Sequence, residues 1–295
     1  MSPVENVFDG HRLQLTAFSR VASVFSPVPG GSMNLKARPP GCGIAVMAKA
    51  SKPGQSKTRL CPPLTFEEAA RFNSCFLQDI AANILAAGQQ TDITGYMAFG
   101  PPGSEPFFQA ILRDNLPTGG LFEAWLPNFG DCLWHAITQQ FARGHQAAVV
   151  LNSDSPTLPT SLLVETALWL AQPGDRAVLG PSTDGGYYLL GLKQAHRRMF
   201  EEIDWSTERV ARQTLDRARE IGLSVHMLPA WYDVDDADAL RTLCAELCGG
   251  RSFASELTPH RAHRTSALLH ALIAEADLAG RLRDRREHIV ERAAE

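Results

Sequence analysis

A cluster of cations early in the chain has the composition of a site for an anion. Lys49, Lys52, Lys57 and Arg59 fall within eleven residues, and Gly54 lies among them. Glycine allows a backbone to approach a phosphate closely, and backbone N–H groups together with lysine and arginine neutralise its charge. The segment lacks the Gly-x-x-x-x-Gly-Lys-Ser/Thr spacing of a P-loop. The pattern predicts a site for an anionic ligand, and the simpler alternative is a solvated basic turn.

Carboxylates stand at three later turns. Asp154 follows a hydrophobic run and precedes Pro156, Asp184 opens an Asp-Gly-Gly turn, and four acids fall within Asp233–Asp238. A magnesium ion shared with phosphates needs only one or two protein carboxylates, so Asp154 is a candidate ligand, although a lone aspartate there is often only a helix cap. The Asp-Gly-Gly segment by itself predicts a hairpin turn. Four adjacent acids are costly unless they are solvated, cap a helix or hold a cation.

Alternating strands and helices must position these turns. Thr65 and Glu68 have the spacing of a capping box, which predicts the start of the first long helix. Strands separated by amphipathic helices indicate βαβ units on a mostly parallel sheet, and ligands of such sheets lie at the carboxyl ends of the strands. The predicted strands are 43–49, 93–99, 123–126, 147–152, 177–179, 187–192 and 224–228, and the predicted helices are 65–87, 106–113, 132–142, 161–171, 208–221 and 237–247.

Composition excludes several classes of protein. With 44% hydrophobic and 20% charged residues, the 295-residue chain can bury a core, and its net charge of −4 provides no basic field for nucleic acid. No apolar run approaches the roughly 18 residues of a membrane span, and the first residues do not resemble a signal peptide. Six cysteines without a Cys-x-x-Cys pair suggest reduced thiols. We therefore expect a soluble cytoplasmic protein without nucleic-acid partners.

Three regions are expected along the chain. Residues 1–40 carry little periodicity and predict a poorly ordered extension, and residues 41–248 hold the alternating elements. Residues 249–295 are rich in arginine, and their apolar positions predict an amphipathic helix over 266–292. This helix is expected to lie on the domain, and a homodimer contact is the alternative.

The order of these motifs resembles a GT-A-fold family of transferases often found beside radical-SAM and selenoprotein-type genes. The family pattern is K-x-P-x-x-G-x-x-K-T-R-L, G-x-D-x-P-x-L, G-P-x-x-D-G-G-Y-Y-L-x-G, W-S-T and D-V-D. The corresponding segments here are Lys49–Leu60, Asn152–Leu158, Gly180–Gly191, Trp205–Thr207 and Asp233–Asp235. The pattern is also similar to that of 2-phospho-lactate guanylyltransferases and, more distantly, molybdenum-cofactor guanylyltransferases. Two departures are Asn152 in place of glycine and Gly130–His135 in place of G-D-L-G-x-R.

The resemblance implies a nucleotide-diphospho-sugar transferase fold, an α/β three-layer fold with a mostly parallel central sheet. It also implies roles for individual residues. Asp184 would be the catalytic carboxylate, and Asp154 and Asp235 would coordinate Mg²⁺ or Mn²⁺. The phosphates would lie against Lys49, Gly54, Lys57, Arg59 and Ser153, and the substrate pocket would contain Gly185, Gly186, Tyr187 and Trp205.

Three functions remain open on these grounds. The preferred one is metal-dependent transfer of a sugar from a nucleotide-diphospho-sugar to a small-molecule or lipid-linked acceptor. The first alternative is nucleotidyl transfer, in which a phosphorylated acceptor attacks an NTP and pyrophosphate is released, because it needs the same metal and basic loop. The second is a degenerate transferase that serves as a binding or scaffold protein, which the altered Gly130–His135 segment motivates.

Overall fold

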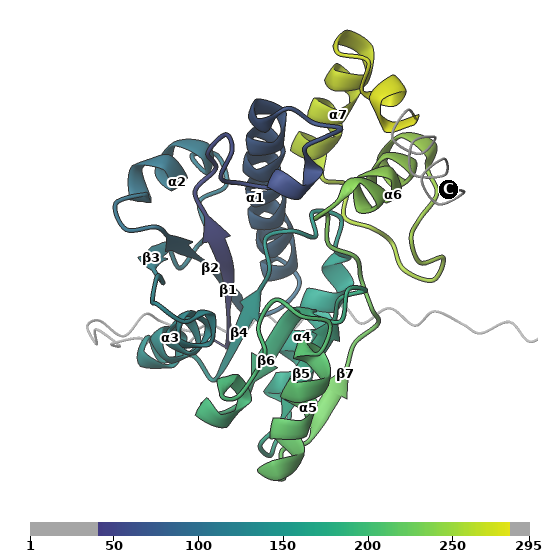
Figure 1. Ribbon diagram of the computed structural model, residues 1–295. Helices are drawn as coiled ribbons and strands as arrows, with labels where there is room; N and C mark the ends of the chain where they lie inside the picture. Colours follow the sequence, from purple (N-terminus) through teal and green to yellow (C-terminus); the bar gives the residue numbers. More distant parts are fainter. Residues whose placement is uncertain (1–40, 284–295) are drawn as a thin grey trace, which may run out of the picture. The chain divides into compact units, whose positions relative to one another are not determined.

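A seven-stranded sheet forms the centre of the computed structural model, which describes residues 41–283 (Figure 1). Its strand order is β3-β2-β1-β4-β6-β5-β7, and within the described residues β6 alone runs antiparallel to its neighbours. The strands are β1 Cys42–Lys49, β2 Ile93–Gly100, β3 Leu121–Glu123, β4 Ala147–Leu151, β5 Ala177–Pro181, β6 Tyr187–Leu192 and β7 Val225–Met227.

Helices cover both faces of the sheet. One face carries α1 Phe66–Gly88, α2 Glu105–Ile111, α4 Thr160–Ala171, α6 Ala237–Gly249 and α7 His263–Glu275, and the other carries α3 Phe129–Ala142 and α5 Val210–Glu220 (Figure 1). Short 3₁₀ helices lie at Thr58–Leu60 and Arg197–Phe200. Because both faces are covered, the strands are apolar on both sides. In β1, Ile44 and Val46 pack with α1, whereas Ala45 and Met47 face the α3 side.

The predicted order of elements is confirmed, and the local signals act as expected. The Thr65 side chain accepts a hydrogen bond from the Glu68 N–H at 3.2 Å, and the Glu68 carboxylate accepts one from the Thr65 N–H at 2.8 Å. The predicted capping box is therefore formed. The Asp-Gly-Gly segment is a turn between the antiparallel strands β5 and β6, as the local pattern predicts.

Most predicted boundaries lie within two residues of the observed ones, and three elements differ by more. β3 lies at Leu121–Glu123 rather than 123–126, because the Gly119 and Gly120 backbone already pairs with β2 before it. Helix α3 begins at Phe129 rather than residue 132. The predicted helix over 266–292 starts at His263 and is interrupted after Glu275, where Asp277 has φ 48°. The predicted extension 1–40 and the end of that helix lie outside the described residues.

The C-terminal segment packs on α1. Leu268, Leu269 and Leu272 of α7 are buried in the same core as α1, and the chain is helical again over residues 278–283. There, the Arg281 guanidinium binds both oxygens of Glu68 at 2.8 and 2.9 Å. The apolar face of α7 is thus covered within the chain. Every helix among residues 41–283 is too short or too polar to span a bilayer.

Substitution of a buried α7 leucine tests this packing. Leu269 is fully buried, so Leu269→Ala should lower the free energy of unfolding by roughly 3 kcal/mol through lost burial and a residual cavity. Leu168→Ala is the matched control, because Leu168 is 54% exposed and its loss should cost less than about 0.5 kcal/mol. Urea denaturation measures both. Equal small losses would show that α7 does not contribute to the core in solution.

Candidate functional site

Two neighbouring parallel strands bring the basic loop and Asp154 together. The loop of residues 50–57 follows β1, and Asp154 follows β4, the direct neighbour of β1 in the sheet. The carboxyl ends of parallel strands meet at one edge, so the two segments adjoin there. The acidic run joins them from the other end of the sequence, since the Val234 N–H donates a hydrogen bond to the Asp154 carbonyl at 2.8 Å.

The side chain of Lys57 links these segments. Its ammonium lies 2.7 Å from Asp154 Oδ1 and 2.6 Å from Asp235 Oδ1, and it donates a further hydrogen bond to the Val234 carbonyl at 3.0 Å. Only 6% of the Lys57 side chain is exposed. Burial alone lowers the pKa of Lys57, but the two carboxylates outweigh it and the net shift is upward. Lys57 therefore remains a cation in this environment.

Asp235 responds to the same contact. Burial alone raises the pKa of its carboxyl, but Lys57 and then Arg59 outweigh that effect and the net pKa is lowered. The Asp235 side chain is 35% exposed and that of Asp154 is 29% exposed, so both carboxylates reach solvent while holding the buried ammonium. Both acids are therefore open to solvent only in part.

A polar cavity of about 270 Å³, here named the basic cavity, surrounds this ion-pair group. Its walls contain six of the residues predicted to bind phosphate or metal: Lys49, Lys57, Arg59, Ser153, Asp154 and Asp235. Asn73 fixes the loop by donating hydrogen bonds to the Lys49 carbonyl and to Ser51 Oγ. Gly54 is the exception among the predicted residues, since it does not line the cavity. Its φ of 72° makes the loop turn.

The two metal-ligand candidates converge on one point. Asp154 and Asp235 each place an oxygen within 2.7 Å of the Lys57 ammonium, so a cation already occupies the space that both carboxylates share. Over residues 41–283, no group of three or more His, Cys, Asp or Glu side chains is arranged to hold a metal ion. The pair therefore fits a Mg²⁺ or Mn²⁺ ion only if phosphate and water supply the remaining ligands, as is usual for magnesium at phosphates.

Asp233 is a site residue that the sequence analysis missed. Burial, followed by the charges of Asp184, Asp235 and Asp154, raises the pKa of the Asp233 carboxyl to about 7. Unlike Asp154 and Asp235, Asp233 has no ion pair with Lys57. The four-acid run marked this segment, but spacing alone did not distinguish Asp235, which pairs with lysine, from Asp233, whose pKa is raised.

The predicted catalytic Asp184 lies at the tip of the β5–β6 turn. Its Oδ1 accepts a hydrogen bond from the Gly186 N–H at 2.9 Å. Gly185 has φ 92°, and a Cβ there would lie 2.2 Å from the Glu208 carbonyl oxygen, so this close approach requires glycine. The two predicted glycines therefore shape the turn and hold Asp184 in place.

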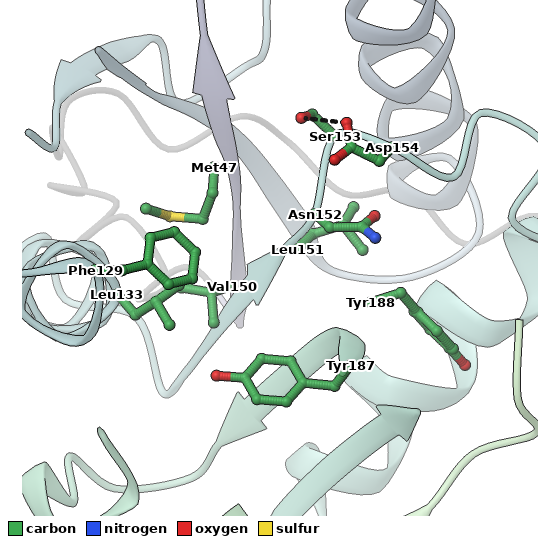
Figure 2. Close-up of a pocket in the computed structure, with 10 residues that line it drawn as sticks. All are labelled: Met47, Phe129, Leu133, Val150, Leu151, Asn152, Ser153, Asp154, Tyr187 and Tyr188. Carbon is green, nitrogen blue, oxygen red and sulfur yellow. Dashed lines mark hydrogen bonds between the residues drawn. The ribbon is translucent and has the colours of Figure 1, made fainter. Parts of the chain in front are cut away.

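A second cavity of about 190 Å³ lies on the other side of Ser153 and Asp154, and we name it the aromatic pocket (Figure 2). Tyr187, predicted as a pocket residue, lines it. The predicted Trp205 stands behind it, with its ring centroid 6.4 Å from that of Tyr187 and 5.3 Å from that of Phe129. Several walls were not predicted from the sequence, and they come from β1, α3 and β4: Met47, Phe129, Leu133, Val150 and Leu151.

Comparisons with known proteins agree with this architecture. A family profile described as "Uncharacterized protein conserved in bacteria (DUF2064)" matches residues 84–207. A crystal structure from Desulfovibrio desulfuricans G20, provisionally described as a nucleotide-diphospho-sugar transferase, is 25% identical with a TM-score of 0.67. That match covers 82% of this chain and 97% of the other. The predicted α/β fold with a mostly parallel central sheet is confirmed. No curated protein sequence matches the chain.

Two further solved structures are less similar. One is a CMP:2-keto-3-deoxy-manno-octonic acid synthetase in complex with CTP, which is 12% identical, has a TM-score of 0.45 and covers 72% of this chain and 100% of its own. The other is a cytidylyltransferase from Leptospira borgpetersenii serovar Hardjo-bovis, also 12% identical, with a TM-score of 0.44 and coverages of 80% and 95%. These TM-scores are too low to bear on the function of this chain.

Removal of the buried ammonium should destabilise the protein. Lys57→Met leaves two partly buried carboxylates without their shared cation and should lower the free energy of unfolding by about 3 kcal/mol at pH 7. Lys52→Met is the matched control from the same loop, because Lys52 is exposed and should contribute less than about 0.5 kcal/mol. Urea denaturation compares the two, and equal effects would contradict the central role of Lys57.

The stability of the protein should depend on the ionisation of Asp233. Because its folded pKa of about 7 lies above its ordinary value of 3.8, the folded state keeps a proton that the unfolded state releases, and stability falls as pH rises between those values. Asp233→Asn cannot ionise at this position. Its free energy of unfolding relative to wild type should therefore rise by on the order of 1 kcal/mol from pH 5.5 to pH 8, allowing for solvent screening.

Urea denaturation at several pH values measures this difference. Glu256→Gln is the control, because Glu256 is exposed and within residues 41–283 its side chain accepts a hydrogen bond from Ser255 alone, so it should follow the wild-type profile. A constant difference between Asp233→Asn and wild type across this range would mean that Asp233 is ionised throughout.

Proposed function

We propose that this protein is a transferase that moves a sugar from a nucleotide-diphospho-sugar to an acceptor hydroxyl. The observation that carries the proposal is the basic cavity, in which three cations and two convergent carboxylates meet at the carboxyl edge of the sheet. Open α/β sheets bind their ligands at this edge. The similarity to the Desulfovibrio structure supports the same class of donor.

The diphosphate of the donor would bind in the basic cavity. Lys49 and Arg59 supply positive charge in its lining, and the Ser153 hydroxyl, which donates to Asp154 Oδ1 at 3.1 Å, lies on its wall. Lys57 is already protonated and adjacent, so it can turn from the carboxylates toward an arriving phosphate. Charge-assisted hydrogen bonds of this kind are stronger than neutral ones, which suits a dianionic ligand.

Asp154 and Asp235 would hold Mg²⁺ or Mn²⁺ when the donor is present. Such a metal neutralises the charge that develops on the departing phosphate oxygen. The two carboxylates already share one cation, and exchange of the ammonium for the metal requires Lys57 to move to the phosphates. We therefore expect metal binding to be much stronger with nucleotide than without it.

Two further carboxylates would act on the acceptor. Asp184 bonds only to the Gly186 N–H, and its second oxygen makes no hydrogen bond within residues 41–283, so it can accept one from an acceptor hydroxyl. Asp233 lies close enough to Asp184 for their charges to interact, and its pKa of about 7 suits a group that takes up a proton near neutrality. We assign Asp184 the orientation of the hydroxyl and Asp233 the reception of its proton.

A thermal-shift panel tests the proposed donor. Nucleoside diphosphates, nucleotide-diphospho-sugars and nucleoside triphosphates are each added with Mg²⁺, Mn²⁺ or EDTA. A ligand that binds only the folded state adds roughly 2.7 kcal/mol at 100 times its Kd. We expect metal-dependent stabilisation by one nucleotide-diphospho-sugar and by its nucleoside diphosphate. Stabilisation by a triphosphate alone would instead favour nucleotidyl transfer, and no shift with any ligand would favour a scaffold role.

Variants connect the shift to the site. Asp154→Asn and Asp235→Asn should each abolish the metal-dependent part of the shift while the chain still folds, because Lys57 keeps its other carboxylate partner. Asp216→Asn is the control, because Asp216 lies on α5 with a side chain that is 46% exposed and pairs with Arg219, and it should leave the shift unchanged. If both site variants retain the full metal-dependent shift, the metal assignment is wrong.

A further inference from the structure

We propose that the aromatic pocket is the acceptor site and that it takes a neutral, hydroxyl-bearing ring with one apolar face. The inference rests on the proposed function for the place of the donor. It names the chemistry of the second substrate, which neither the fold nor the basic cavity specifies. Four features of the pocket support it: its position, its walls, its unpaired polar atoms and its lack of cations.

The position is next to the expected diphosphate. Ser153 and Asp154 line both the aromatic pocket and the basic cavity, so the two spaces adjoin across this short turn. In Figure 2, Ser153 and Asp154 lie at one end of the pocket, and Tyr187 and Leu133 lie at the other. A ligand in the aromatic pocket would therefore place its near end beside the bond that the transfer breaks.

The walls are apolar and partly aromatic. Phe129 remains 52% exposed although it belongs to a helix that packs on the sheet, and its ring meets Trp205 at 81°. Met47 and Val150 form the floor on the sheet side. Pockets for small molecules combine such walls with a few polar groups that fix the orientation of the ligand. The apolar face of a sugar or similar ring suits an exposed aromatic side chain.

Two polar atoms at the pocket lack a partner. The Tyr187 hydroxyl and the Asn152 amide oxygen are buried and make no hydrogen bond within residues 41–283, while the other end of the Asn152 amide donates to Ser155 Oγ at 3.2 Å. Figure 2 shows the Tyr187 hydroxyl directed toward the α3 side of the pocket, away from Tyr188. Buried polar groups without a partner are rare because they are costly.

These atoms match the chemistry of a hydroxyl. Burial raises the pKa of Tyr187, so its hydroxyl keeps the proton and donates, whereas the Asn152 oxygen accepts. Ligand hydroxyls do both, and a ring that carries several of them can satisfy both atoms at once. The asparagine that replaces the family glycine at position 152 thereby acquires a role as a specificity determinant.

The lining of the pocket favours a neutral acceptor over an anionic one. None of its lining residues is Lys, Arg or His, and its one charged side chain is the carboxylate of Asp154, which already pairs with Lys57 of the basic cavity. A phosphate placed in the aromatic pocket would find no cation among the lining residues, in contrast to the basic cavity next to it. A neutral acceptor favours glycosyl transfer over the nucleotidyl transfer considered above, in which the acceptor is phosphorylated.

Saturation-transfer-difference NMR with defined probes tests the inference. The probes are phenyl β-D-glucopyranoside, a neutral ring with an apolar substituent, and α-D-glucose 1-phosphate, its charged counterpart. Each is titrated into the full chain, alone and with the nucleoside diphosphate identified by thermal shift. With the basic cavity filled by the nucleoside diphosphate, we expect the phenyl glucoside to bind at least tenfold more tightly than the sugar phosphate. Equal or tighter binding of the sugar phosphate under that condition, or no binding of the neutral probe, overturns the proposal.

A pair of tyrosine variants locates the binding. Tyr187→Phe removes only an unpaired hydroxyl. It should therefore weaken the binding of the phenyl glucoside at least fivefold, while the melting temperature of the free protein stays the same or rises. Tyr96→Phe is the matched control, because the Tyr96 hydroxyl already bonds to His145 at 2.6 Å, and it should lower the melting temperature without changing the affinity. Unchanged affinity in Tyr187→Phe overturns the assignment.

Failure of this inference differs from failure of the proposed function. If nucleoside diphosphate binds normally but the neutral probe does not, the acceptor assignment is wrong and the donor assignment stands. If no nucleotide binds but the neutral probe still binds in a way that depends on Tyr187, the pocket is a binding site for neutral rings and the transferase proposal is wrong.

Discussion

The buried ammonium of Lys57 is the contact on which the candidate site depends. It joins three segments that are far apart in the sequence, since it comes from the loop after β1 and binds Asp154 after β4 and Asp235 before α6. Asp184 adds further negative charge near these acids, and burial together with these charges raises the pKa of Asp233, so without a cation the carboxylates would repel one another. The removal of one partner from a buried ion pair leaves an uncompensated charge and is strongly destabilising.

This contact also carries local strain. Lys57 has φ 53°, a left-handed conformation that is uncommon for a residue with a side chain, and it begins the 3₁₀ helix at Thr58–Leu60. Such conformations persist where the surroundings enforce them, and they gather at functional sites. Here the enforcing contacts are two carboxylates and one carbonyl. A ligand that gives the ammonium another partner would weaken the contacts that enforce this loop conformation. Ligand binding and loop conformation are therefore coupled.

Sequence patterns predicted the fold well because its signals are local or periodic. The Thr65 and Glu68 capping box, the strand–helix alternation and the Asp-Gly-Gly hairpin each depend on neighbours in the chain. The phosphate and metal candidates converged because parallel strands bring their carboxyl ends together. The pairing of Lys57 with Asp235 could not be predicted in this way, since the two residues are 178 positions apart and β7 lies at the far edge of the sheet from β1.

The walls of the aromatic pocket were missed for a related reason. Phe129 and Met47 are ordinary apolar residues of a helix and a strand, and nothing in their local pattern separates a pocket wall from a core position. Only packing across α3, β1 and β6 leaves a space among them. That space ends at Asp154, where the basic cavity begins, so one aspartate separates a region of cations from a region without any. A charged donor and a neutral acceptor are thereby directed to opposite sides of one carboxylate, and the arrangement selects each substrate by a different physical property.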